Sequence, residues 1–225
     1  MKILHDLRND YLTSPIDENS LDKNPIKQFV KWFEGAEKVL KGDCNAFVLS
    51  TYSLIEKRIH SRVLLLKEVT SEGFVFFTNY ESLKAQDMAE HPVVSMNFFW
   101  NDLHQQVRIE GNASKISQEL SKKYFYSRPK ESQIAAFLSP QSKVIESHAE
   151  LMNKHQELSK KYGDLPVPFP ENWGGYIIKP ECIEFWQGRT HRLHDRIVYK
   201  KVMGGVRSVD GSQEDFIWSI NRLAP

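Results

Sequence analysis

Apolar side chains near the start of the chain recur at helical spacing and then give way to short strand-like runs. After Asn24-Pro25, an N-cap followed by a proline suited to a first helical turn, apolar residues recur three and four positions apart as far as Leu40. Runs rich in β-branched and aromatic residues follow, and they predict strands over 46–52, 59–66, 73–78, 93–100 and 105–116. A small helix is predicted over 82–90, ended by His91-Pro92.

The second half of the chain changes from strand to helix and back. Helices are predicted over 117–127 and 142–162, separated by Arg128-Pro129 and a short apolar segment. Strand patterning resumes over 175–179, 183–187, 197–202 and 216–222. Short strands at this spacing favour an antiparallel barrel or sandwich over a doubly wound sheet. Because no repeat or composition break interrupts the chain, we predict one mainly β domain with peripheral helices over residues 1–225.

Composition limits the classes of protein to consider. A hydrophobic fraction of 40% over 225 residues is enough for an ordinary globular core. Lys and Arg total 30 against 29 for Asp and Glu, so the net charge of +1 gives no global case for nucleic acid or an anionic membrane. The N-terminus acquires charge too early for a signal peptide, and no apolar run approaches membrane-spanning length. We therefore expect a cytoplasmic protein.

The segment His191-Arg192-Leu193-His194-Asp195-Arg196 is the first candidate for chemistry. Its histidines and aspartate suggest a metal site, but in an extended segment alternate side chains point to opposite sides, which separates them. Alternation would instead gather Arg192, His194 and Arg196 into a cationic row suited to phosphate or carboxylate. A solvated edge strand that carries charge against aggregation is an equally open interpretation. We predict no metal here.

A second candidate is the set Tyr124, Arg128 and Ser132, whose spacing of four would place them on one helix face. Pro129 disfavours helical geometry at Arg128 and suits the start of a new helix, so free backbone N–H groups could lie beside Arg128. Such a helix start is a natural phosphate site. The alternative is a surface hinge between two packing helices.

Weaker candidates complete the set. Arg62 and Lys67 flank an apolar strand, where their odd separation places them on opposite faces. Ser82-Leu83-Lys84 and Gln141-Ser142 precede predicted helices and are possible phosphate cradles. Trp186 could form an aromatic wall, although a core position is the commoner reason for a tryptophan.

Taken in order, the motifs RVLLLK, YFYSRPKESQ, FWQG and HRLHDR resemble the pyridoxamine 5′-phosphate oxidase family, and the resemblance spans essentially the whole chain. The resemblance implies an FMN-binding split β-barrel and a homodimer with FMN at the subunit interface. The implied reaction oxidises pyridoxine or pyridoxamine 5′-phosphate to pyridoxal 5′-phosphate with O2 as electron acceptor, yielding H2O2, and ammonia from the amine.

The resemblance also implies roles for individual residues. FMN would be bound by Arg62, Val63, Leu64, Leu65, Leu66, Lys67, Phe77, Thr78, Lys84, Gln106, Gln141, Ser142, Trp186 and Arg196. The substrate would be bound by Arg8, Tyr11, Lys67, Tyr124, Arg128, Ser132, Arg192, Leu193 and His194. Arg192 and His194 would serve catalysis, and residues 1–23, with Arg8 to Tyr11, would form a mobile lid.

Two features depart from the family pattern. Leu83 stands where the family often has an arginine that contacts the FMN phosphate, so one charge-assisted contact is missing. The stretch 203–215 is longer than the usual hairpin, which we interpret as a surface loop that leaves the site intact.

Three rival functions remain beside the oxidase. The nearest is a flavin reductase, or an oxidase of another substrate, on the same barrel. A non-catalytic carrier of FMN or pyridoxal phosphate would bind ligand without turnover. A barrel for single-stranded nucleic acid is disfavoured by the balanced charge.

Overall fold

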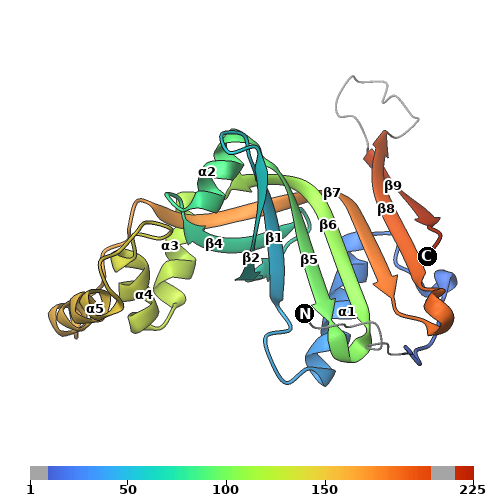
Figure 1. Ribbon diagram of the computed structural model, residues 1–225, viewed down its shortest axis with the longest axis horizontal. Helices are drawn as coiled ribbons and strands as arrows, with labels where there is room; N and C mark the ends of the chain where they lie inside the picture. Colours follow the sequence, from blue (N-terminus) through green and yellow to red (C-terminus); the bar gives the residue numbers. More distant parts are fainter. Residues whose placement is uncertain (1–9, 204–215) are drawn as a thin grey trace, which may run out of the picture.

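The computed structural model describes residues 10–203 and 216–225, and in these residues nine strands form one sheet (Figure 1). The strands are β1 (Ala46–Ser53), β2 (Arg58–Leu65), β3 (Glu68–Val69), β4 (Phe74–Asn79), β5 (Val93–Trp100), β6 (Gln105–Lys115), β7 (Trp173–Gln187), β8 (Asp195–Met203) and β9 (Phe216–Arg222). The helices are α1 (Pro25–Val39), α2 (Leu83–Glu90), α3 (Gln118–Ser127), α4 (Lys130–Leu138) and α5 (His148–Tyr162), with 3-10 turns η1 (Glu18–Ser20), η2 (Asn101–Leu103) and η3 (Thr190–Arg192).

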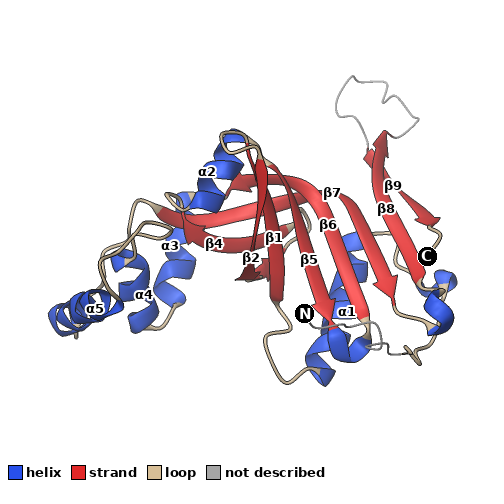
Figure 2. Ribbon diagram, viewed as in Figure 1, coloured by secondary structure: helices blue, strands red, loops and turns tan. Residues whose placement is uncertain are grey.

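All strand pairs are antiparallel, in the order β2-β1-β5-β6-β7-β4-β3, with β8 and β9 joined through β7. Figure 2 shows the helices at the periphery of this curved sheet, with α3, α4 and α5 gathered at one end and β8 and β9 at the other. The predicted mainly β architecture with peripheral helices is confirmed.

Helix α1 closes the main core because its apolar stripe packs on the sheet. Asn24 caps it, with its side chain accepting from the backbone N–H groups of Ile26 and Lys27. Phe29 is fully buried, and its ring lies 4.9 Å from that of Phe74 and 5.1 Å from that of Phe98. Burying one such side chain contributes about 1.5–3 kcal/mol, so this contact fixes the helix against the sheet.

The long strand β7 corrects the prediction of two separate strands over 175–179 and 183–187. It runs through Pro180 because the pairing with β6 shifts register between Glu110 and Gly111. A Cβ on Gly111 would lie 2.2 Å from the carbonyl oxygen of Lys179, so the close approach of the two strands requires glycine. As a result, β7 connects the two ends of the molecule.

The region between β6 and β7 differs most from the sequence-based expectation. The apolar segment after Pro129 is a full helix, α4, and the helix predicted over 142–162 begins only at His148. Helices α3 and α4 cover a second cluster of buried residues made by Phe125, Ile134, Val167 and Trp173. None of the described helices is long and apolar enough to cross a membrane.

Candidate functional site

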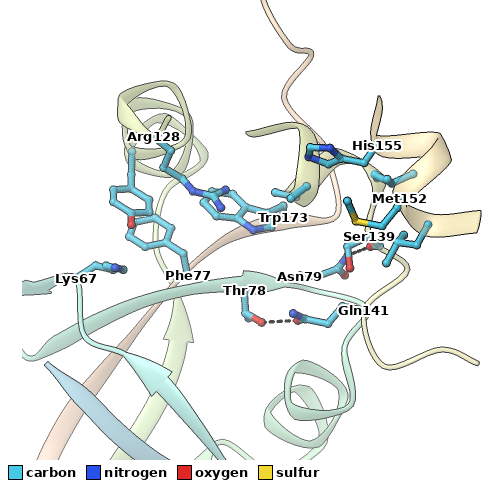
Figure 3. Close-up of a pocket in the computed structure, with 15 residues that line it drawn as sticks. Lys67, Phe77, Thr78, Asn79, Arg128, Ser139, Gln141, Met152, His155 and Trp173 are labelled. Atoms are coloured by element: carbon cyan, nitrogen blue, oxygen red, sulfur yellow. Dashed lines mark hydrogen bonds between the residues drawn. The ribbon is translucent and has the colours of Figure 1, made fainter. Parts of the chain in front are cut away.

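A cavity of about 480 Å³ lies between the end of the sheet and the helices α3, α4 and α5 (Figure 3). Its walls include Lys67, Phe77, Tyr124, Arg128, His155 and Trp173. The volume falls within the range of small-molecule sites, and the lining combines apolar rings with a few cationic side chains.

Arg128 contributes an unsatisfied donor to this cavity. Its guanidinium carbon lies 4.9 Å from the centre of the Trp173 ring, the arrangement drawn in Figure 3. Among the described residues its buried Nη1 has no hydrogen-bond partner. Burial lowers the pKa of Arg128, yet a guanidinium stays charged at any ordinary pH. A buried charged donor without a partner is costly, so this position favours an anionic ligand.

Tyr124 and Arg128 face the cavity together, but Ser132 does not join them. The ring of Tyr124 stacks on that of Phe77 with 3.9 Å between centroids. Arg128 is the C-cap of α3, and α4 begins immediately after Pro129. The shared helix face suggested by the spacing is therefore wrong, whereas the expected break at Arg128-Pro129, with a new helix after it, is confirmed. Ser132 is not among the residues that line the cavity.

Next to the cavity lies a polar cluster formed by Arg62, Thr78, Lys84 and Gln141. The buried Lys84 Nζ donates to Thr78 Oγ1 at 3.1 Å, to Ser82 Oγ at 3.1 Å and to Gln141 Oε1 at 3.0 Å. Burial, and then the charge of Arg62, lowers the pKa of Lys84 to about 8. The structure thus brings together four residues that the resemblance assigns to FMN, from separate elements and, for Gln141, from far along the sequence.

This cluster, which we call the Lys84 cluster, fits a phosphate group. Among the described residues the hydrogen-bond partners of Lys84 Nζ are the neutral side chains of Thr78, Ser82 and Gln141, and the positive charge of Arg62 acts on it as well. Because the hydrogen-bond partners of Lys84 Nζ are neutral, its positive charge is left unpaired, and a phosphate would supply the matching charge. Leu83 occupies the first position of α2 and adds no charge there, as the sequence indicated.

A second group of predicted residues surrounds Trp186 at the far end of β7. The His194 ring lies 4.7 Å from Trp186, and Tyr11 lies within 6.0 Å of both rings. His194 Nδ1 accepts from the backbone N–H of Arg189 at 3.0 Å, so in the neutral ring the proton is on Nε2. Burial, followed by the charge of Arg192, lowers the pKa of His194, which favours this neutral form.

The cationic row predicted from alternation is wrong. Residues 190–192 form the turn η3, in which His191 and Arg192 have positive φ of 55° and 60°, and β8 begins only at Asp195. The extended geometry that alternation requires is therefore absent at the first half of the motif. Arg192 and Leu193 are exposed, whereas Arg196 pairs with the buried Glu184 at 2.7 Å.

The remaining predicted residues occupy both regions. Gln106 lies opposite Trp186 in the β6–β7 ladder, while Val63 to Leu66 follow Arg62 at the other end of the sheet. Ser142 is exposed in the turn after Gln141. Arg8 and the loop over 204–215 lie outside the described residues. The lid remains a prediction, although Tyr11 packs beside the Gly188 backbone and Ile16 N–H donates to Asp195 Oδ2 at 3.1 Å.

One chain does not bring the two groups together. Phe77 lies opposite Gly175 on β7, and Arg196 lies opposite Trp186 on the same strand. At about 3.3 Å per residue, the steps along β7 from Gly175 to Trp186 correspond to a strand length of roughly 36 Å. Measured along the strand, the two groups therefore lie near opposite ends of β7.

Sequence reasoning missed two residues that shape these groups. Trp173, under Arg128, follows an irregular segment that carries no periodic signal. Glu184 is 3% exposed and is also 2.9 Å from Arg108 Nη2. The sequence did contain a signal for Glu184: a carboxylate between Ile183 and Phe185 in an apolar strand needs a cationic partner.

Comparisons with known proteins agree along nearly the whole chain. The family model described as pyridoxamine 5′-phosphate oxidase matches residues 33–160, and the pyridoxine 5′-phosphate oxidase C-terminal dimerisation region matches residues 173–225. The pyridoxine/pyridoxamine 5′-phosphate oxidase 2 of Hydrogenovibrio crunogenus is 45% identical over 222 residues, which cover 99% of this chain and 98% of that protein. The corresponding oxidase of Aliarcobacter butzleri is 47% identical over 222 residues, with 99% of each chain covered.

Solved structures share the fold at low sequence identity. PhzG from Burkholderia lata, in complex with tetrahydrophenazine-1-carboxylic acid, aligns with a TM-score of 0.83 at 23% identity, covering 96% of this chain and all of that one. A pyridoxamine 5′-phosphate oxidase-related, FMN-binding protein from Nostoc punctiforme aligns with a TM-score of 0.66 at 14% identity, covering 91% of this chain and all of that one. The split-barrel fold expected from the sequence is confirmed. On these sequence matches, the chain belongs to the pyridoxine/pyridoxamine 5′-phosphate oxidase family.

Proposed function

We propose that this protein binds FMN and oxidises pyridoxine or pyridoxamine 5′-phosphate to pyridoxal 5′-phosphate, with O2 as the electron acceptor. The observation that carries the proposal is Arg128, which lines a cavity beside the Lys84 cluster and whose buried Nη1 has no hydrogen-bond partner among the described residues. Two adjacent cationic positions suit two phosphorylated ligands, a cofactor and a substrate. The sequence relatives near 45% identity support the same reaction.

The site is proposed to be completed by a second copy of the chain. Thr78 of the Lys84 cluster pairs with Gly174 near the start of β7, whereas Trp186 lies near its end, so we infer that each ligand uses one group from each subunit. The edge strand β2 supports this arrangement, because Ile59 and Val63 share one face and are 70% and 66% exposed. A match to a dimerisation region over 173–225 adds to it.

When bound, FMN supplies the hydride acceptor, and O2 regenerates it with formation of H2O2. The residues of the chain bind and orient the reactants. Arg62 and Lys84 hold the cofactor phosphate, while Lys67, Tyr124 and Arg128 hold the substrate phosphate remote from the reacting carbon. Oxidation removes a hydride and a proton from the substrate alcohol or amine, and water then converts the imine formed from the amine to aldehyde and ammonia.

His194 and Arg192 are proposed to act at the substrate ring. Because His194 Nδ1 is occupied by the Arg189 N–H, its Nε2–H points away as a donor to a substrate oxygen or nitrogen. Arg192 contributes a permanent positive charge and so cannot accept the departing proton. The pair therefore orients the ring, and the proton passes to another acceptor.

A direct assay tests the proposal. The purified protein is examined for flavin absorbance and then supplied with pyridoxine 5′-phosphate in air, while aldehyde and H2O2 are measured. The two products should form in equal amounts. Pyridoxine without the phosphate is the control and should turn over poorly. Bound flavin without turnover would support a carrier instead, and equal rates with both substrates would support an oxidase for another ligand.

A further inference from the structure

A buried carboxylate lies directly behind the Lys84 cluster and has no part in the proposed reaction. Asp87, on α2, is 2% exposed. One of its oxygens, Oδ2, accepts from Thr51 Oγ1 at 2.6 Å and lies 3.1 Å from His60 Nδ1. Thr51 lies on β1 and His60 on β2, so this carboxylate connects the helix to two strands.

The hydroxyl of Thr51 donates one hydrogen bond and accepts another, and each partner has a fixed role. A hydroxyl has one proton, and an ionised carboxylate can only accept, so Thr51 donates to Asp87. Its oxygen is then left to accept from Arg62 Nη1, which lies 2.8 Å away. The same Nη1 reaches the carbonyl oxygen of Leu49 at 3.3 Å. The order of donation is therefore Arg62 to Thr51 to Asp87.

The charges of Arg62 and Asp87 explain why a hydroxyl lies between them. Burial lowers the pKa of Arg62, and the negative charge of Asp87 opposes that effect. A direct bidentate pair between a carboxylate and the guanidinium group would occupy two of the N–H donors of Arg62. Here Thr51 stands between them, and among the described residues only Nη1 of Arg62 is engaged. The carboxylate compensates the charge while Nε and Nη2 remain available to a ligand.

We propose that Asp87, acting through the Thr51 hydroxyl, is a positioning residue that orients Arg62 toward the phosphate of FMN. This inference rests on the proposed FMN site. Asp87 itself makes no proposed contact with the cofactor. Removal of the Thr51 hydroxyl would break the connection between Asp87 and Arg62.

The substitution Thr51→Val tests the link, with Thr51→Ser as the matched control. Valine keeps the volume and branching of threonine and removes the hydroxyl, whereas serine keeps the hydroxyl. Apoprotein is titrated with FMN, and the quenching of flavin fluorescence gives Kd. We expect Thr51→Val to weaken FMN binding about tenfold and Thr51→Ser to stay within about twofold of wild type.

A second arm separates positioning from a general loss of structure. In an Arg62→Met background, Thr51→Val should change the FMN Kd no further, because the residue it positions is gone. An equal loss in both backgrounds would overturn the proposal, as would an unchanged Kd for Thr51→Val. Asp87→Leu, which removes the acceptor of the Thr51 hydroxyl, should behave like Thr51→Val, and if that variant does not fold, the valine and serine pair decides. If wild-type protein does not bind FMN, the proposed function itself fails.

Discussion

Arg128→Met is the substitution whose outcome the structure specifies most closely. In the apoprotein the arginine makes one favourable contact, over Trp173, and carries one buried donor without a partner among the described residues. Loss of the cation–π contact costs about 0.5–2 kcal/mol, while removal of an unsatisfied buried donor recovers about 1–3 kcal/mol. Methionine retains much of the packing volume. The free energy of unfolding of the apoprotein should therefore stay constant or rise.

Substrate binding should respond in the opposite way. A charge-assisted hydrogen bond to phosphate contributes about 1.5–3 kcal/mol, which corresponds to an increase in KM of about 10- to 150-fold for pyridoxine 5′-phosphate. Since the reacting carbon is remote from the phosphate, kcat should fall much less. Pyridoxine, which lacks the phosphate, should show nearly the same KM with the variant as with wild type.

Steady-state kinetics with both substrates, together with thermal unfolding of the apoprotein, measure these effects. Lys123→Met is the matched control, because Lys123 is an exposed cation on the same helix. It should leave KM unchanged at moderate ionic strength. A KM for the Arg128 variant within twofold of wild type would refute the reasoning, and so would a destabilised apoprotein with an equal loss for both substrates.

Three further predictions follow from the same geometry. The pKa of Lys84 is lowered to about 8 from the usual value of 10.5, so between these pH values the unfolded chain binds more protons than the folded one, and the stability of the apoprotein should rise with pH. FMN affinity should fall over the same range, because FMN binding uses the charged form of Lys84. Chemical denaturation and fluorescence titration at several pH values measure the two effects. Glu184→Gln should lower the free energy of unfolding by about 1–3 kcal/mol, measured by urea denaturation, because two arginines lose a buried carboxylate. Arg192→Ala should reduce turnover more than FMN occupancy and Arg196→Ala the reverse; equal losses of both quantities in each variant would contradict this division.

The fold was predictable where local pattern and tertiary packing agree. In β1 and β5 buried positions alternate with partly or fully exposed ones, in β1 without a break, so the period of two in the sequence matches the structure there. Prediction failed at β7, because Pro180 is an ordinary signal for a strand end. Only the register shift at Gly111, a feature of the neighbouring strand, makes the proline tolerable.

The candidate site was predictable in residue type but not in arrangement. Motif resemblance named Thr78, Lys84 and Gln141 individually, while their convergence depends on the turn after α4 that places Gln141 beside α2. No periodicity encodes that turn. The same holds for Trp173, whose position under Arg128 is set by the second core cluster rather than by its neighbours in sequence.

The local rules fail most clearly at backbone positions next to the proposed ligands. Among the described residues, positive φ occurs outside glycine at Lys57, His104, Ser142, His191 and Arg192. Two of these, Ser142 and Arg192, carry predicted binding roles, His191 precedes one, and the His104 ring lies 4.4 Å from that of Tyr11. Each such conformation costs about 1–3 kcal/mol and persists only when surrounding contacts hold it. The prediction from alternation assumed extended backbone over 191–196, whereas residues 190–192 form a turn with positive φ at His191 and Arg192 and β8 begins at Asp195. Positive φ at His104, His191 and Arg192 thus occurs beside the Trp186 group, which favours the proposed ligand role of this group over the charged edge strand that the sequence also allowed.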